Sequence, residues 1–161
     1  MAVDMFLKLD GIDGESQDET HAGEIDVLAW SWGASQSGTT HMGSGGGGGK
    51  VSVQDFSFTK YVDKATNLLW QRVFDGKPIK EGVLVMRKAG GEQQEYFKVT
   101  LTDLIVSSVS TGGSGGEDRL TENVTLNFAE TGIEYFPQKP DGTLDAAMPA
   151  GWNIEKNVAT V

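Results

Sequence analysis

The sequence contains no cysteine, and histidine occurs only twice among its 161 residues. No disulfide can form, so the stability of the fold does not depend on the redox state of its compartment. His21 and His41 are far apart in the chain and would need carboxylates from elsewhere to hold a zinc ion. We therefore expect no metal and no cofactor, and these residues offer little to an enzyme that uses a nucleophilic side chain.

Basic residues are also scarce, because 13 Lys and Arg face 23 Asp and Glu and leave a net charge of −10. An acidic protein repels phosphate backbones, so no nucleic-acid partner is expected. Long hydrophobic runs are missing as well. Near the start, Asp4 and Lys8 interrupt the apolar residues, and no basic segment precedes them. We expect neither a cleaved signal peptide nor membrane insertion, which by itself predicts a cytoplasmic protein.

Glycine is abundant, with 22 residues, or about twice the share of roughly 7% found in average proteins. Few segments show helical spacing, so this composition favours a turn-rich β protein. A chain of this length normally forms one domain, and we assign residues 1–161 to a single domain. The predicted fold class is mainly β, an antiparallel barrel or sandwich with one α-helix.

The clearest β signal lies in Val106–Ala129, which reads as two strands joined by a glycine-rich hinge. Period-two alternation places the two sets of side chains on opposite faces of a strand. The apolar face carries Leu120, Val124, Leu126 and Phe128, and the polar face carries Thr121, Asn123, Thr125 and Asn127. The hinge contains Gly112, Gly113, Ser114, Gly115 and Gly116. A solvent-facing surface of Thr and Asn, rather than Lys and Glu, would suit a surface past which water and other proteins move.

Further strands and one helix follow from the same reasoning. The helix is predicted over Asp63–Asp75, with Asp63 or Thr66 as its cap and Gly76 as its end. The remaining strands are expected at Val3–Leu9, Glu24–Trp32, Val51–Phe58 (with a bulge at Gln54–Asp55 or burial on both faces), Gly82–Lys88, Gln94–Leu101, Leu104–Val109 and Gly151–Val158, with a turn at Ala89–Gly91, a possible strand at Gly132–Phe136 and a connection at Pro137–Pro149.

Two stretches are candidates for contacts outside the domain. In Glu24–Trp32, Trp30 and Trp32 share one face, which favours packing in the core or at an interface. Their neighbours Ala29 and Ser31 would then face away from the core. The loop Gly38–Gly49 carries seven glycines in the sequence, which is too long and too flexible for an ordinary hairpin turn. A partner could order such a loop.

Several motifs resemble binding or catalytic signatures but lack their context. Gly112–Gly116 fits G-x-S-x-G, yet a strand pattern follows it and both histidines lie upstream. Ser44–Val51 approaches a phosphate loop, but Ser44 replaces the first glycine and Val51 replaces the hydroxyl that binds magnesium. The acidic segment Asp10–Thr20 lacks the oxygen spacing of an EF-hand, so a solvated loop is favoured. We therefore predict no enzyme activity.

Six segments together closely resemble the haemolysin-coregulated protein (Hcp) family of type VI secretion tube subunits. They cover most of the chain in the family's order, and none is a common motif. Asn67 stands where the family often has proline, which bears on the start of the helix. Besides the Val106–Ala129 stretch, the segments are MAVDMFLKLDGIDGES at the start, EIDVLAWSWG at Glu24–Gly33, SFTKYVDKAT at Ser57–Thr66, RKAGG at Arg87–Gly91 and GWNIEKN at Gly151–Asn157.

The resemblance implies a structural role. Hcp-like subunits form hexameric rings that stack into an inner tube, and the tube leaves the cytoplasm through the secretion machine without a signal peptide. Implied partners are further copies of the chain, sheath, spike and baseplate proteins, and small effectors carried in the ring. Candidate cargo residues are Ala29 and Ser31. Candidate interface or stacking residues are Gly45, Gly46, Gly47, Gly48, Gly49, Gly112, Gly113, Ser114, Gly115, Gly116 and Trp152, the last because a C-terminal edge strand can pair with a neighbour.

Two other functions remain open from the residues alone. A phage-tail tube protein would share the architecture. A secreted β-module that binds sugar or calcium through Trp and Asp side chains would differ in being monomeric, so native mass separates it from a ring.

Overall fold

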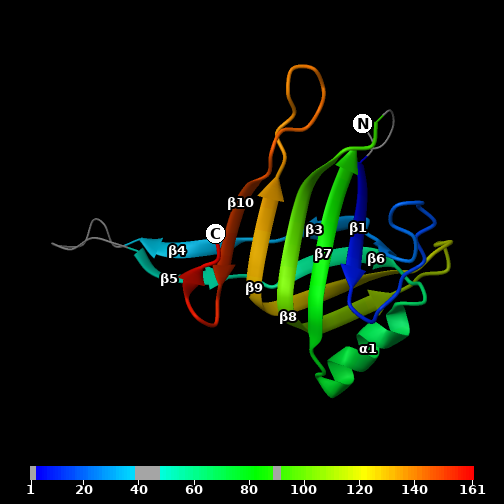
Figure 1. The fold of residues 1–161 in the computed structure, drawn as a ribbon. Helices are drawn as coiled ribbons and strands as arrows, with labels where there is room; N and C mark the ends of the chain where they lie inside the picture. The colour runs from blue at the N-terminus through cyan, green and yellow to red at the C-terminus, as the bar shows by residue number, and fades with distance from the viewer. Residues whose placement is uncertain (1–2, 39–47, 89–91) are drawn as a thin grey trace.

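The computed structural model describes residues 3–38, 48–88 and 92–161. The chain folds into an antiparallel sheet of nine strands with one helix, and a second, two-stranded sheet projects from it (Figure 1). The main path of the large sheet runs β11-β10-β9-β8-β7-β1-β2, and β6 joins β3 to β9. The predicted fold class is therefore confirmed. No helix within the described ranges is long and apolar enough to cross a membrane.

The strand bounds differ from the predicted ones mainly in length. The strands are β1 (Val3–Leu9), β2 (Ile25–Asp26), β3 (Ala29–Ser31), β4 (Ala34–Gly38), β5 (Gly48–Val53), β6 (Phe56–Tyr61), β7 (Ile79–Lys88), β8 (Glu95–Gly112), β9 (Thr121–Tyr135), β10 (Met148–Asn153) and β11 (Val158–Ala159). The predicted hairpin around the glycine-rich hinge is confirmed as the β8–β9 pair. The predicted turn at Ala89–Gly91 lies outside the described residues.

The strands predicted at Gln94–Leu101 and Leu104–Val109 are one bent strand, β8. Its buried residues change parity, from Val99 and Leu101 to Leu104 and Val106. Asp103, between them, has a φ of 52°, a left-handed conformation that turns the next side chain to the other face. The bend lets β8 and β9 run through both halves of the sheet (Figure 1). The segment 132–135 is accordingly the end of β9.

Two predicted strands are interrupted because the chain changes partners. The strand expected over Glu24–Trp32 splits into β2, paired with β1, and β3, paired with β6, and Leu28 between them is 40% exposed rather than packed beside Trp30. The strand expected over Val51–Phe58 splits into β5 and β6, which belong to different sheets. At Gln54–Asp55 the apolar residues switch from odd to even positions because the chain passes from one sheet to the other, and not because of a bulge.

The helix α1 (Thr66–Asp75) begins three residues later than predicted and ends where predicted. Asp63 lies in the preceding turn, where its carboxylate accepts the backbone N–H of Ala65. Thr66 is the first helical residue, and its hydroxyl accepts the N–H of Asp63. At the other end, Gly76 has a φ of 68° and its N–H donates to the Arg72 carbonyl, as expected of a glycine that closes a helix.

The C-terminal strand predicted over Gly151–Val158 is also shifted. β10 begins at Met148 and includes Pro149, which falls within the connection predicted at Pro137–Pro149. β10 pairs with β9 along its length but with β11 only at Trp152 and Asn153. In the described chain, the Met148–Ala150 part of β10 is therefore an open sheet edge, the position that tolerates proline.

Candidate functional site

Four neighbouring strands present a surface of small polar side chains, which we call the small polar face. The cross-strand register aligns Ser31, Ser57, Thr125 and Ser108, and the next row aligns Ala29, Thr59, Asn123 and Ser110. The alternate residues of these strands form the core, so the face points away from it. The sequence predicted Thr and Asn on one face of β9, and the structure extends that face across β3, β6 and β8.

Hydrogen bonds between its own side chains hold this face in place. Thr59 Oγ1 donates to Asn123 Oδ1 over 2.6 Å, and Thr125 Oγ1 lies 2.6 Å from the hydroxyls of both Ser107 and Ser108. At one end, the Asp55 carboxylate accepts hydrogen bonds from Ser107 and Asn127. The face therefore offers short, mutually satisfied groups and no long side chain in its two central rows.

Ala29 and Ser31 lie on the small polar face and are exposed. The tryptophan between them, Trp30, points the other way, where it stacks on Phe56 at 5.6 Å and donates from its ring N–H to the Met86 sulfur. Trp32 likewise packs edge-on against Phe128. The predicted inward packing of the two tryptophans is confirmed, and with it the outward facing of their neighbours.

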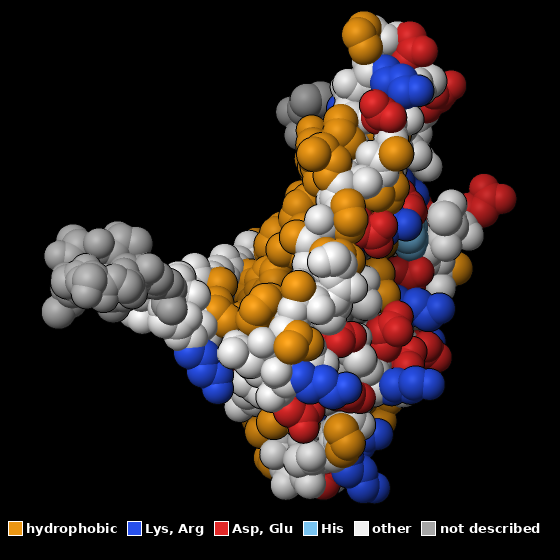
Figure 2. All heavy atoms as spheres, turned by 60° about the vertical axis from the view of Figure 1, so that its left-hand side comes forward, with side chains coloured by type: hydrophobic (Ala, Val, Ile, Leu, Met, Phe, Trp, Pro, Cys, Tyr) orange, Lys and Arg blue, Asp and Glu red, His pale blue; other side chains and the backbone are white. Residues whose placement is uncertain are grey.

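A second surface is an apolar groove between the β4–β5 hairpin and strands β9 and β10. It has a volume of about 490 Å³. Figure 2 shows hydrophobic side chains gathered in this hollow beside the projecting arm. Exposed apolar hollows of this kind are typical of protein–protein interfaces. Its apolar lining residues include Trp32, Val51, Val53, Ile133, Ala150 and Trp152.

The sequence-predicted interface residues are divided between this groove and other places. Trp152 and Gly49 line the groove, and Gly48 pairs with Gly38 at the start of β5. Gly45, Gly46 and Gly47 lie outside the described residues. The projecting β4–β5 sheet has two strands, so within the described chain each has an open edge.

The glycine-rich hinge lies apart from the groove, at the far end of the β8–β9 hairpin. Gly112 ends β8, and residues 113–116 form the first part of the connection that leads to β9 at Thr121. None of the four hinge glycines has a positive φ. A Cβ at Gly113 would lie 2.6 Å from the end of the Leu120 side chain, which would have to move to make room for it. Leu120 itself precedes β9 and is 45% exposed, so it does not join the buried apolar face.

Beneath the small polar face lies a buried charged cluster that the sequence analysis missed. Lys60 on β6 and Glu122 on β9 are fully buried and in contact, and the Lys60 ammonium also bonds Asp63 over 2.8 Å. Thr66, at the start of α1, donates its hydroxyl to Glu122 over 2.8 Å. The cluster therefore ties the helix to the strands of the face. The sequence did carry a signal for this cluster. Lys60 and Glu122 both stand at positions where the period-two pattern of their strand calls for an apolar residue.

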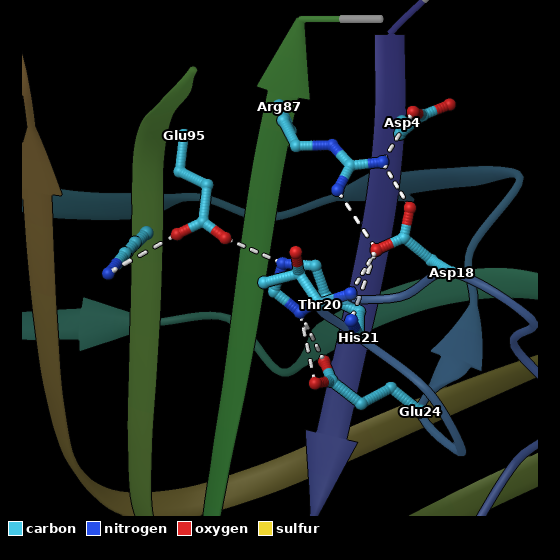
Figure 3. A network of polar contacts seen from close by, with 8 residues as sticks. Asp4, Asp18, Thr20, His21, Glu24, Arg87 and Glu95 are labelled. Atoms are coloured by element: carbon cyan, nitrogen blue, oxygen red, sulfur yellow. Dashed lines mark hydrogen bonds and ion pairs between the residues drawn. The ribbon is translucent and has the colours of Figure 1, made fainter. Parts of the chain in front are cut away.

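The acidic segment after β1 is bound to the sheet, contrary to the prediction of a solvated loop. We call residues 10–24 the acidic strap. Arg87 on β7 bonds Asp18 of the strap and Asp4 on β1, and His21 lies between Glu24 and Glu95 (Figure 3). The hydrogen bonds from Arg87 hold the pKa of Asp18 far below its usual range, and backbone N–H groups of the strap add to this. The strap covers Phe6, whose ring stacks against His21 at 4.5 Å.

Catalytic or metal chemistry finds no support in the arrangement of these residues. Within the described residues, no group of three or more histidine, aspartate or glutamate side chains is placed to hold a metal ion. Ser114 of the G-x-S-x-G motif lies in the β8–β9 connection, and the ring of His21 is engaged by two carboxylates, those of Glu24 and Glu95.

Comparison with known proteins shows the family of the chain. Residues 6–135 match the family described as "Type VI secretion system effector, Hcp". The chain is 62% identical over 160 residues to protein hcp1 of Pseudomonas aeruginosa, covering 98% of this chain and 99% of that protein. The chain belongs to the Hcp family. Its relationship to type VI secretion, implied by the resemblance in sequence, is thereby confirmed.

Solved structures agree with this assignment. The crystal structure of Hcp1 from Salmonella typhimurium is 44% identical and superposes with a TM-score of 0.82, covering 99% of both chains. A structure described as a type six secretion system protein is 32% identical, with a TM-score of 0.89 over 99% of this chain and 100% of that one. The family is one of structural secretion proteins, so this member is a type VI secretion protein.

Proposed function

We propose that the chain is a subunit of the type VI secretion tube, assembling through its apolar groove into a hexameric ring that carries small effectors. Membership of the Hcp family supports the tube role. The observation that carries the assembly is the groove, because an apolar hollow of about 490 Å³ beside open strand edges is stabilised when a neighbouring copy covers it.

Ring closure satisfies the physical requirements of such a contact. A head-to-tail interface leaves one groove uncovered at the end of any open chain of subunits, and closure into a ring covers them all. The projecting β4–β5 hairpin extends the groove wall outward, so it reaches toward a neighbour (Figure 1). The glycine loop and the glycine-rich hinge contribute to contacts between neighbours, and sheath, spike and baseplate proteins contact the assembled tube.

In this assembly the small polar face lines the lumen. Its side chains are short and hydrogen-bonded to each other, so a passing protein meets few groups that would hold it strongly. Ala29 and Ser31 lie on that face and contact cargo.

Analytical ultracentrifugation of the purified chain at micromolar concentration tests the ring. A particle with six times the 17.2 kDa chain mass is expected. Val51→Asp places a charge in the groove and should give a folded protein of single-chain mass, because an unpaired buried charge is costly. Ile105→Asp, on an exposed site of β8 that does not line the groove, is the matched control. A stable monomer of the unmodified chain would exclude the proposal.

A further inference from the structure

One histidine joins the acidic strap to the sheet through both of its ring nitrogens. His21 Nδ1 lies 3.0 Å from Glu24 Oε2 within the strap, and His21 Nε2 lies 2.6 Å from Glu95 Oε1 at the start of β8 (Figure 3). The His21 side chain is only 8% exposed, so little water can take the place of either carboxylate. Its ring also stacks against Phe6 of β1, which holds it between the two carboxylates. His21 therefore fastens the strap to the sheet at one defined point.

These two contacts together need two hydrogens, one between each ring nitrogen and the carboxylate that it meets. A neutral imidazole carries one N–H group, and a protonated imidazole carries two. A neutral ring between two ionised carboxylates would therefore direct a lone pair at one of them. That carboxylate would lose its hydrogen bond in a place where water cannot restore it, which is costly. The fastened strap thus holds one proton more than a detached strap whose imidazole is neutral.

The charges around the ring are predominantly negative, with seven carboxylates and three cations on the strap and on four strands. They are Asp10, Asp18 and Glu24 on the strap, Asp4 and Lys8 on β1, Asp26 on β2, Glu81 and Arg87 on β7, and Glu95 and Lys98 on β8. Lys98 approaches Glu95 only to 3.7 Å, and Arg87 is engaged by Asp18 and Asp4. A positive ring therefore meets more attraction than repulsion in this place.

The other fastenings of the strap do not change charge near neutral pH. Arg87 keeps its charge in proteins, and its hydrogen bonds hold the pKa of Asp18 far below the usual range. Before α1, the Glu15 carboxylate accepts the backbone N–H of Lys64 over 2.7 Å. Both contacts hold the strap ahead of residue 19. Loss of the histidine contact would therefore loosen the strap locally, between residues 19 and 24.

We propose that His21 acts as a proton-dependent latch, which fastens residues 19–24 of the strap to β8 while its ring is protonated and releases them from Glu95 when the proton leaves. Because fastening takes up a proton, a rise in pH favours release. Histidine is the side chain whose charge ordinarily changes between pH 5 and pH 8, so the latch responds across this range. Release uncovers Phe6 and opens the polar hollow of about 270 Å³ that His21 lines. The latch belongs to one chain and does not depend on ring assembly.

Hydrogen exchange of strap amides tests the latch in the purified chain, whatever its state of assembly. The amides of Gly23 and Glu24 donate to the carbonyls of Ser16 and His21, so they exchange when this part of the strap loosens. After correction for the intrinsic effect of pH on exchange, their protection should fall about tenfold from pH 5 to pH 8, since a single linked proton changes an equilibrium by up to about tenfold per pH unit. Amides in the middle of β9 should show no such fall. Unchanged protection of Gly23 and Glu24 across this range overturns the proposal.

Glu95→Gln should remove the pH dependence and keep the strap fastened. Its amide can turn either an oxygen or an NH₂ group toward the ring, so it bonds the neutral and the protonated imidazole alike. Lys98→Gln is the matched control on the same strand, because it removes a charge beside Glu95 and leaves the ring contact in place. His41→Gln is the control for the other histidine, which lies outside the described residues. Both controls should keep the fall in protection. A fall that survives Glu95→Gln, or that disappears in His41→Gln, overturns the proposal.

Nitrogen NMR of the imidazole is a second measurement that does not depend on the folding of Glu95→Gln. In the His41→Gln chain, His21 is the only histidine, so its ring signals need no further assignment. Both ring nitrogens should carry a proton at pH 5, and the loss of one proton should accompany the fall in protection of Gly23. A ring that is neutral while the strap amides remain protected would show that fastening needs no proton, and the proposal would then be wrong.

Discussion

The ammonium nitrogen of Lys60 lies 2.5 Å from Glu122 Oε1, and neither side chain is exposed to solvent. The pair joins β6 to β9 directly beneath the small polar face. Burial of two charges is tolerated because each neutralises the other, so the loss of one leaves the second uncompensated. The structure thus places a fully buried ion pair under the surface proposed to line the lumen.

Removal of the Lys60 charge should destabilise the fold strongly. Lys60→Met leaves the Glu122 carboxylate buried without its cation, which is expected to cost about 3–5 kcal/mol of unfolding free energy. Urea unfolding at fixed protein concentration measures it. The double variant Lys60→Met/Glu122→Leu should regain part of the loss, since no buried carboxylate remains at position 122, whereas Asp63 still lacks its Lys60 partner. A double variant as unstable as the single one would show that the pair acts through something other than charge.

The Asp18–Arg87 contact should make stability depend on pH in the acid range. The Arg87 hydrogen bonds lower the pKa of Asp18 in the folded chain, so the ionised carboxylate favours folding. This contribution is fully present above the ordinary aspartate pKa of about 3.9 and is lost as the pH falls toward the folded-state pKa. The unmodified protein should therefore exceed Asp18→Asn in stability by a constant amount from pH 7 to pH 5. The difference should shrink from pH 4 to pH 2. Thermal unfolding of both at each pH provides the measurement, and a gap that widens in acid would contradict the assignment.

The end of α1 should require glycine for conformational reasons alone. Gly76 has a φ of 68°, and nothing lies within 4 Å of the position of a Cβ. Gly76→Ala should therefore cost about 1 kcal/mol, which is the strain of a left-handed alanine without any clash. Gly116→Ala is the control, because that site is equally open but has no positive φ. Equal effects of the two substitutions in chemical denaturation would argue against a backbone origin.

A large side chain on the small polar face should leave the fold intact but should weaken the proposed retention of effectors. Ser31→Tyr adds a large ring to an exposed site, so the ring assembly should remain intact. A co-expressed small effector should be retained less, which native mass spectrometry of the purified assembly measures. Thr20→Tyr, on the exposed part of the acidic strap, is the control for added bulk. If Ser31→Tyr separates the subunits instead, Ser31 lies at an interface and the facing of the sheet is reversed.

The alternation of side chains along the strands was enough to predict much of the fold. It placed the β8–β9 hairpin, the inward packing of Trp30 and Trp32, and the polar face of β9, because each follows from strict period-two spacing over several residues. Gly76 marked the end of the helix correctly for a similar reason, since few other residues accept that conformation.

The failures occurred where the pattern breaks. When the buried side chains of a strand switch from odd to even positions, the cause can be a bulge, a residue with positive φ or a change of sheet. The cause is a positive φ at Asp103 and a change of sheet at Gln54–Asp55, and the sequence pattern is the same for both. The sequence did not reveal the apolar groove, apart from Gly49 and Trp152, because its walls come from the β4–β5 hairpin and from β9 and β10, which are distant in sequence. Surfaces assembled from remote segments have no local signature.

The bend at Asp103 has a mechanical consequence. β8 and β9 continue through the bend without interruption. A force applied to one half of the sheet is therefore transmitted to the other half through the covalent backbone of these two strands. Pulling these two strands past each other would load their hydrogen bonds in shear, so that many must break at once. Stiffness of this kind would suit the proposed tube, and amide exchange should be slowest in the middle of these two strands.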